Sequence, residues 1–156
     1  MTEGQEQQLP TIVTPVRLEY DYTPGTAASR FLRNIAKGQY VGQRCPKCKK
    51  VYVPPRGSCP TCGVATDEEV PLGQTGTITA FCVVNIPFAG QAVECPYVSA
   101  TIKLDGADIG FYHLIQEVPY DQIHIGMRVE AVWKDRSEWG PTTESIAHFR
   151  PVTEGA

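Results

Sequence analysis

The sequence lacks the features of a membrane-spanning or exported chain. No run approaches the roughly 18 apolar residues that cross a bilayer. The first ten residues, MTEGQEQQLP, have neither the basic start nor the apolar stretch of a secretion signal. We therefore expect a cytoplasmic protein, in which cysteines are reduced and available for metal binding.

Acidic residues are missing from residues 27–66. This stretch holds eight of the 14 basic residues, whereas the rest of the chain has six basic residues against 17 acidic ones. The formal charges are therefore +8 and −11, which sum to −3. A segment of this charge should attract an anion or an acidic protein surface. Its basic residues are Arg30, Arg33, Lys37, Arg44, Lys47, Lys49, Lys50 and Arg56.

The sequence also lacks a recognisable catalytic constellation. It contains no Ser/His/Asp arrangement, no paired carboxylates and no glycine-rich phosphate loop at a known spacing. The three histidines, His113, His124 and His148, fall on separate predicted elements. We therefore expect that this chain is not an enzyme on its own.

Two Cys-Pro-x-Cys turns stand ten residues apart in the segment QRCPKCKKVYVPPRGSCPTCG. Two such turns can complete a tetrahedron of thiolates with Zn–S distances of about 2.3 Å. The spacing predicts a zinc ribbon with one structural zinc, and the alternative metal is iron in a rubredoxin-like site. The predicted ligands are Cys45, Cys48, Cys59 and Cys62. We interpret Cys82, which lies in a strand pattern, as a small buried apolar residue.

The chain of 156 residues divides into three predicted segments. Residues 1–15 are polar and predict a flexible tail. Residues 16–70 contain an alternating segment at 16–22, expected to pack on one face, followed by a helix and the ribbon. Thr26 is the predicted N-cap of this helix and Gly38 its end, and its apolar face repeats at helical spacing. That face consists of Ala28, Phe31, Leu32 and Ile35.

Residues 71–152 predict a mainly β fold. Five β-prone runs are separated by turn signals, and the second and third runs are joined by a short turn that predicts a hairpin. Five short strands with one long loop favour a five-stranded OB-fold barrel. The runs cover residues 77–84, 97–104, 109–115, 127–133 and 144–149.

The order of these parts, RCPKC, VYVPPR, CPTCG and then strands ending in GMRVEAVW, resembles a known family. It is similar to the rubredoxin-like zinc ribbon plus OB-fold proteins associated with acyl-CoA metabolism, and the likeness extends over residues 20–149. The resemblance implies a small partner subunit of thiolase-like or lipid-transfer-protein-type enzymes, including those that cleave steroid side-chain acyl-CoA thioesters by a retro-aldol reaction. Of the site residues, it carries over only the four zinc ligands.

Further binding residues are inferred from charge and loop character alone. Coenzyme A carries several phosphate charges, and a cationic stripe on a helix can pair with them. The candidates on this stripe are Arg30, Arg33, Lys37 and Arg44. Phe88 and Tyr97, at the loop 85–96, could contact an acyl chain or a partner enzyme, and the alternative is an ordinary connection. Trp139 is expected to be exposed at an interface.

A second function from a different class is a single-stranded nucleic-acid-binding module, because both zinc ribbons and OB barrels serve that purpose. Such a module needs a basic barrel groove interleaved with aromatic side chains. From residue 67 onward, acidic residues outnumber basic ones. We therefore favour the accessory-subunit hypothesis.

Overall fold

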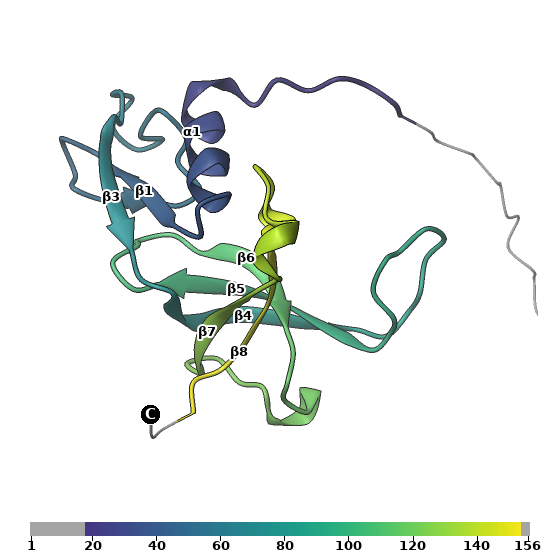
Figure 1. The fold of residues 1–156 in the computed structure, drawn as a ribbon. Coiled ribbons are helices and arrows are strands. Elements are labelled where there is room, and N and C mark those ends of the chain that lie inside the picture. The colour runs from purple at the N-terminus through teal and green to yellow at the C-terminus, as the bar shows by residue number, and fades with distance from the viewer. Residues whose placement is uncertain (1–17, 154–156) are drawn as a thin grey trace, which may run out of the picture.

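A computed structural model describes residues 18–153, in which a helix and a small sheet precede a barrel (Figure 1). The sheet has the order β2-β1-β3, and β1 pairs antiparallel with both neighbours. The two cysteine turns connect its consecutive strands. The bounds are α1 Gly25–Ile35, β1 Tyr40–Arg44, β2 Val51–Tyr52 and β3 Glu68–Leu72.

The five predicted runs in the second half all contain strands, and these form a closed barrel of order β4-β5-β6-β8-β7. The predicted hairpin is confirmed, because β5 and β6 pair antiparallel. The last strand begins later than expected because residues Thr143–Ser145 form a short 3₁₀ helix, η3. The strand bounds are β4 Thr75–Val84, β5 Tyr97–Leu104, β6 Phe111–Ile115, β7 Arg128–Trp133 and β8 Ile146–Pro151. The fold is thus mainly β, with a ribbon and an OB-type barrel as predicted.

Helix α1 buries the predicted face, since Phe31 and Ile35 are both buried. Its N-terminus differs from the prediction. Pro24 occupies the N-cap position, no side chain caps the helix, and Thr26 lies inside the first turn. The predicted cap is therefore wrong, because the helix begins two residues earlier than the Thr26 cap implies.

Gly38 follows α1 with a φ of 75°. A Cβ atom at this position would lie 2.5 Å from the Trp139 ring, so the glycine allows the indole to pack closely. Trp139 also donates a hydrogen bond from Nε1 to the Lys134 carbonyl at 2.7 Å, and its ring centroid lies 5.0 Å from that of Trp133. The prediction of an exposed Trp139 is therefore wrong.

The alternating segment before α1 is not a packed strand. Leu18, Tyr20 and Tyr22 are exposed, and no other strand pairs with this segment in residues 18–153. An alternating pattern divides the side chains of an extended segment between two faces, but the segment packs as a strand only where a neighbouring strand is present. Val16, Arg17 and the predicted tail at residues 1–15 lie outside the described residues.

One apolar core joins α1 and the ribbon to the barrel. Tyr40, on β1, is buried at the centre of this core. Its ring centroid lies 5.7 Å from that of Phe111 on β6 and 5.5 Å from that of Trp133 on β7. The boundary near residue 70 remains a prediction, and packing across it is continuous.

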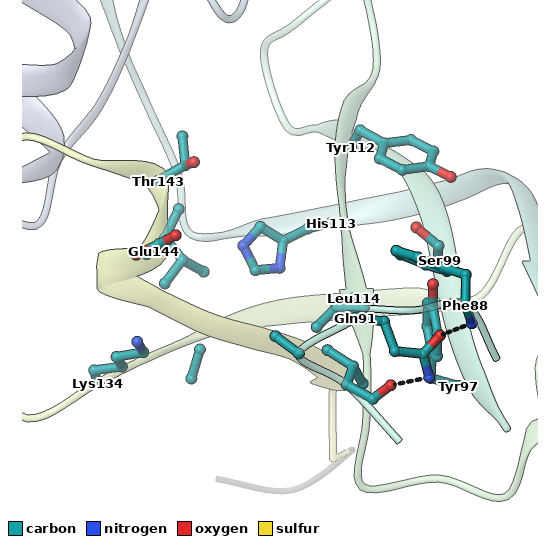
Figure 2. A pocket seen from close by; sticks show the side chains of 14 residues that line it. Phe88, Gln91, Tyr97, Ser99, Tyr112, His113, Leu114, Lys134, Thr143 and Glu144 are labelled. Atoms are coloured by element: carbon teal, nitrogen blue, oxygen red, sulfur yellow. Dashed lines mark hydrogen bonds between the residues drawn. The ribbon is translucent and has the colours of Figure 1, made fainter. Parts of the chain in front are cut away.

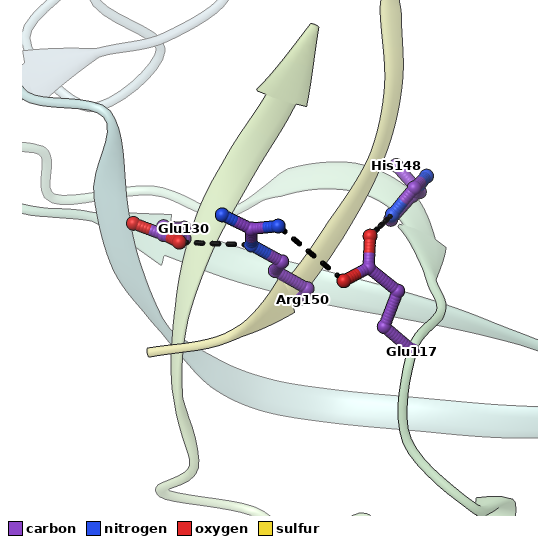
Figure 3. A network of polar contacts seen from close by, with 4 residues as sticks. All are labelled: Glu117, Glu130, His148 and Arg150. Atoms are coloured by element: carbon purple, nitrogen blue, oxygen red, sulfur yellow. Dashed lines mark hydrogen bonds and ion pairs between the residues drawn. The ribbon is translucent and has the colours of Figure 1, made fainter. Parts of the chain in front are cut away.

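The barrel is closed between β6 and β8, a parallel pair with one register contact, Ile115↔Phe149. Polar side chains reinforce this short contact, as Figure 3 shows. Glu117, just after β6, accepts a hydrogen bond from His148 Nε2 at 2.7 Å and pairs with Arg150 at 3.4 Å. Arg150 in turn donates to Glu130 on β7 at 2.9 Å. We call these four residues the Glu117 network.

Candidate metal centre and neighbouring surfaces

The two cysteine turns have equivalent backbones. Lys49 N–H donates to the Cys45 carbonyl at 3.0 Å, and Gly63 N–H donates to the Cys59 carbonyl at 2.9 Å. Lys49 and Gly63 both have a φ of 65°, the left-handed conformation that reverses the chain after each turn. In the first turn, the N–H groups of Lys47 and Cys48 point at the Cys45 sulfur, each at 3.4 Å. Each Cys-Pro-x-Cys turn therefore aims its sulfurs toward the same point.

The four cysteine sulfurs form a single cluster. All four Sγ atoms lie within 4.8 Å of one another, and those of Cys48 and Cys59 are 3.7 Å apart. A tetrahedron with Zn–S bonds of about 2.3 Å places its sulfurs about 3.8 Å apart. The residues thus fit a single four-coordinate zinc.

Local electrostatics differ among the four thiols. The Tyr52 hydroxyl lies 3.3 Å from Cys59 Sγ, and this hydrogen bond lowers the pKa of Cys59 to about 6. Burial raises the pKa of Cys62 to about 12. Cys59 and Cys62 therefore differ in acidity, and a divalent metal bound by all four sulfurs would balance the negative charge of their thiolates.

Asp108 fixes the ribbon to the barrel, a role that the sequence patterns did not indicate. Val51 N–H on β2 donates to Asp108 Oδ2 at 2.8 Å, and Asp108 N–H donates to the Val51 carbonyl at 3.0 Å. Asp108 lies in the turn between β5 and β6. The orientation of the ribbon relative to the barrel is therefore set by these two hydrogen bonds, one of them to the Asp108 side chain, as well as by the core.

The predicted cationic stripe divides into free and paired side chains. Arg30, Arg33 and Lys37 are exposed and form no ion pair or hydrogen bond through their side chains with residues 18–153. Arg44 instead pairs with Glu68 at 3.0 Å across the β1–β3 pair. Three of the four predicted cations thus have no side-chain partner among residues 18–153 and are available to an anion, whereas Arg44 is paired with Glu68.

The two predicted apolar residues come together. Phe88 and Tyr97 line one pocket, together with residues of β5, β6, β8 and η3 (Figure 2). The pocket also includes His113, to which the sequence analysis assigned no binding role. No sequence signal identifies this pocket, because its walls meet only through the strand register of the barrel.

The prediction that Cys82 is a buried apolar residue is wrong. The side chain is exposed on β4 rather than buried. The middle of β4 leaves Ala80, Phe81 and Cys82 exposed, after a register shift between Ile78 and Ala80 that ends the alternating burial of its first residues. A β-bulge of this kind changes which side chains face the core.

Comparison with known proteins agrees with this architecture. The model for the rubredoxin-like zinc ribbon domain of ChsH2 matches residues 38–68, and that for the ChsH2 C-terminal OB-fold domain matches residues 69–134. A DUF35 domain-containing scaffold protein from Methanocaldococcus jannaschii is 35% identical over 101 residues, which are 64% of this chain and 71% of that protein. The chain belongs to the DUF35 family. Its four-cysteine cluster lies in the zinc ribbon domain of that family.

Two further relatives are named for enzymes. A solved structure described as "Ltp2-ChsH2(DUF35) aldolase" contains a chain that is 27% identical, with a TM-score of 0.65, and the match covers 85% of this DUF35 protein and 100% of that chain. A probable enoyl-CoA hydratase alpha subunit from Thermomonospora curvata is 36% identical over 93 residues, 60% of this chain. The match covers only 28% of that second protein, so the likeness is to one part of it.

Within residues 18–153, none of the helices has the length and apolar character needed to span a bilayer.

Proposed function

We propose that this DUF35 protein is a non-catalytic, zinc-binding accessory subunit that docks on a thiolase-fold acyl-CoA enzyme. The observation that carries the proposal is the likeness, over 85% of the chain, to the chain of an Ltp2-ChsH2 aldolase. The enzyme that we infer is a retro-aldolase acting on the acyl-CoA thioesters of steroid side-chain degradation. The Methanocaldococcus relative is described as a scaffold protein, which supports a role without chemistry of its own.

The metal has a structural role in this proposal. We infer that Cys45, Cys48, Cys59 and Cys62 hold one zinc ion and leave it no open coordination position. A zinc with four thiolate ligands stabilises the fold and does not activate water. The ion would fix the two turns, and through Asp108 the ribbon is tied to the barrel.

The free cations supply the second part of the proposal, which is assistance in acyl-CoA binding. Arg30 and Arg33 are exposed on α1, and Lys37 follows the helix at a spacing that continues the stripe. Charge-assisted hydrogen bonds to the phosphates of coenzyme A would neutralise them. The nucleic-acid alternative has less support, because only one lysine, Lys134, lines the barrel pocket.

The test measures cleavage of a steroid side-chain acyl-CoA by the thiolase-fold enzyme, with and without this chain. We expect the wild-type chain to raise kcat/KM. The triple variant R30A/R33A/K37A should raise KM for the acyl-CoA by about tenfold at low salt, because exposed charge pairs contribute modestly and are screened. The difference should shrink as ionic strength rises.

A charge-matched control separates local contacts from net charge. The variant K47A/K49A/K50A removes three exposed cations from the first cysteine turn of the ribbon and should leave KM unchanged. Equal KM values for the α1 variant and the wild-type chain would remove the stripe from the proposal. An enzyme whose kcat/KM is the same with and without this chain would contradict the accessory role itself.

A further inference from the structure

The two cysteine turns bury their sulfurs unequally. The first cysteine of each turn is buried, with 0% of Cys45 and 1% of Cys59 exposed. The second cysteine of each turn, Cys48 or Cys62, is only partly buried. We call Cys48 and Cys62 the outer pair. The zinc site therefore has a protected side within the protein and an accessible side that consists of the outer pair.

Hydrogen bonding divides the four sulfurs in the same way. Cys45 Sγ accepts hydrogen bonds from the N–H groups of Lys47 and Cys48, each at 3.4 Å. Cys59 Sγ accepts one from the Tyr52 hydroxyl at 3.3 Å. Neither sulfur of the outer pair accepts a hydrogen bond from an N–H or O–H group among residues 18–153. A hydrogen bond withdraws electron density from a metal-bound thiolate, so exposure and hydrogen bonding both identify the outer pair as the more nucleophilic sulfurs.

The outer pair is also placed to form a bond with itself. All four Sγ atoms lie within 4.8 Å of one another, and the outer pair takes one sulfur from each turn. Cys48 Sγ lies 3.7 Å from Cys59 Sγ as well. Cys59 is buried, however, and its sulfur is held by Tyr52. A sulfur that reacts in the outer pair therefore meets its more available partner in the other member of that pair.

Loss of the metal would affect the cysteine turns more than the barrel. The turns form a small cluster of their own, in which two of the three buried side chains are cysteines. The main core, which joins α1 and β1 to the barrel, contains none of the four metal-binding cysteines. A small unit of this kind takes most of its folding energy from its metal, so the turns should open without zinc while the barrel stays folded. The cluster consists of Cys45, Tyr52 and Cys59, with Cys48, Cys62, Val64 and Ile109 packed against it.

We propose that the outer pair is a site of oxidation by hydrogen peroxide, at which a Cys48–Cys62 disulfide replaces two of the bonds to zinc. The modification releases the metal and opens the cysteine turns, while α1 and the barrel keep their fold. The proposal rests on the four-sulfur cluster and not on docking to an enzyme, so it goes beyond the proposed function and is tested without a partner.

The reaction balances with peroxide as the only oxidant. One thiolate of the outer pair attacks a peroxide oxygen, so that an S–O bond forms, the O–O bond breaks and the released hydroxide takes a proton from solvent. The other thiolate attacks this sulfenic sulfur, so that the S–S bond forms, the S–O bond breaks and a second hydroxide is protonated. The two thiolates lose two electrons and the peroxide gains them, giving two water molecules. Cys45 and Cys59 remain as ligands, which is too few for a structural zinc site.

The first test maps the reactive sulfurs in the zinc-loaded full chain. The variant C82S/C95S serves as the background, because it removes the two cysteines outside the cluster. N-ethylmaleimide, at a dose that modifies few chains, should label the outer pair about tenfold more than Cys45 and Cys59. Hydrogen peroxide should release one zinc ion for each Cys48–Cys62 disulfide, measured with a colorimetric chelator and by mass spectrometry of peptides. Dithiothreitol and added zinc should restore the starting state.

The second test uses trypsin to locate the structural change. Lys47, Lys49 and Lys50 are exposed in the first cysteine turn, so opening of this turn should raise the rate of cleavage there by about tenfold. Lys103, on β5, is the internal control within the same chain, and its cleavage rate should not change.

Three results would overturn the proposal. The first is equal labelling of all four cysteines by N-ethylmaleimide. The second is a peroxide product in which the main disulfide includes Cys45 or Cys59, or in which zinc is retained. The third is an equal rise in cleavage at Lys103 and in the cysteine turn, because the barrel would then open together with the ribbon. None of these results bears on whether the chain docks on an enzyme.

Discussion

Lys49 and Gly63 occupy the same left-handed position after the two cysteine turns. A non-glycine residue in this conformation costs on the order of 1 kcal/mol relative to glycine. Lys49→Gly should therefore raise the free energy of unfolding of the zinc-loaded protein by about 0.5–1 kcal/mol. The reciprocal change, Gly63→Lys, should lower it by a similar amount, and urea denaturation measures both.

Because the two turns are equivalent, the two variants should change the free energy of unfolding in opposite directions. If Lys49→Gly destabilised the protein as much as Gly63→Lys does, backbone strain would not explain the behaviour at this position. Zinc content, measured for each variant, confirms that both turns still hold the metal.

Tyr40 buries its hydroxyl without a hydrogen-bond partner in residues 18–153, and burial raises its pKa far above the usual value. An unsatisfied buried hydroxyl costs about 1–3 kcal/mol. Tyr40→Phe should therefore raise the free energy of unfolding by about 1 kcal/mol in urea denaturation. Tyr52→Phe is the matched control and should lower it, because the Tyr52 hydroxyl contacts Cys59 Sγ at 3.3 Å. A loss of stability in Tyr40→Phe would show that its hydroxyl does have a partner.

Among the elements, β6 and β8 form the weakest junction of the barrel, with a single register pair. Glu117 supports this junction from the β6 side, and its hydrogen bond from His148 lowers the pKa of the Glu117 carboxyl. A carboxyl with a lowered pKa in the folded state stabilises the protein above its unfolded pKa, 4.5, and this contribution is lost as the pH falls through the folded value. Glu117→Gln should therefore lower the urea midpoint at pH 7.

The same substitution should have a smaller effect as the pH falls below 4.5. Glu138→Gln is the control, because this exposed glutamate in the 3₁₀ helix Arg136–Glu138 has no side-chain partner within residues 18–153. A Glu117→Gln midpoint equal to that of Glu138→Gln at pH 7 would show that the Glu117 network does not support the junction.

The sequence predicts elements well where the pattern is local. Cysteine spacing identifies the ribbon because both turns are short and self-contained, and residues 97–104 form β5 within the predicted bounds. Prediction fails where a residue distant in the sequence decides whether a side chain is buried. Leu18, Tyr20 and Tyr22 alternate with polar residues, but no strand lies beside them and they are exposed. Cys82 is exposed because a register shift changes which side chains of β4 point toward the core.

The candidate site was predictable to a similar degree. The four sulfurs gather as their spacing indicates. Arg44 could not be recognised as paired, because Glu68 is 24 residues away and meets it only through the register of β1 and β3. His113 and its pocket depend on contacts among three strands and a loop, which no periodicity encodes.

At the scale of the whole molecule, α1, the ribbon and the barrel share a continuous core. Arg30 and Arg33 lie on α1 without an ion-pair partner among residues 18–153, and the pocket lies on the barrel wall that α1 approaches through η3. A protein built in this way presents a fixed surface rather than two independently moving modules. Such rigidity suits a scaffold, because a preorganised surface loses little entropy when it docks.

The most direct test of the accessory role is a native mass measurement of the chain co-expressed with a thiolase-fold acyl-CoA enzyme. We predict a complex that contains both proteins in a fixed ratio, with the mass of one zinc ion for each copy of this chain. Replacement of Cys45 and Cys48 by serine should abolish both the zinc and the complex. A chain that appears only as the free protein beside the free enzyme would contradict the accessory role, and a complex that forms without zinc would contradict the structural role of the metal.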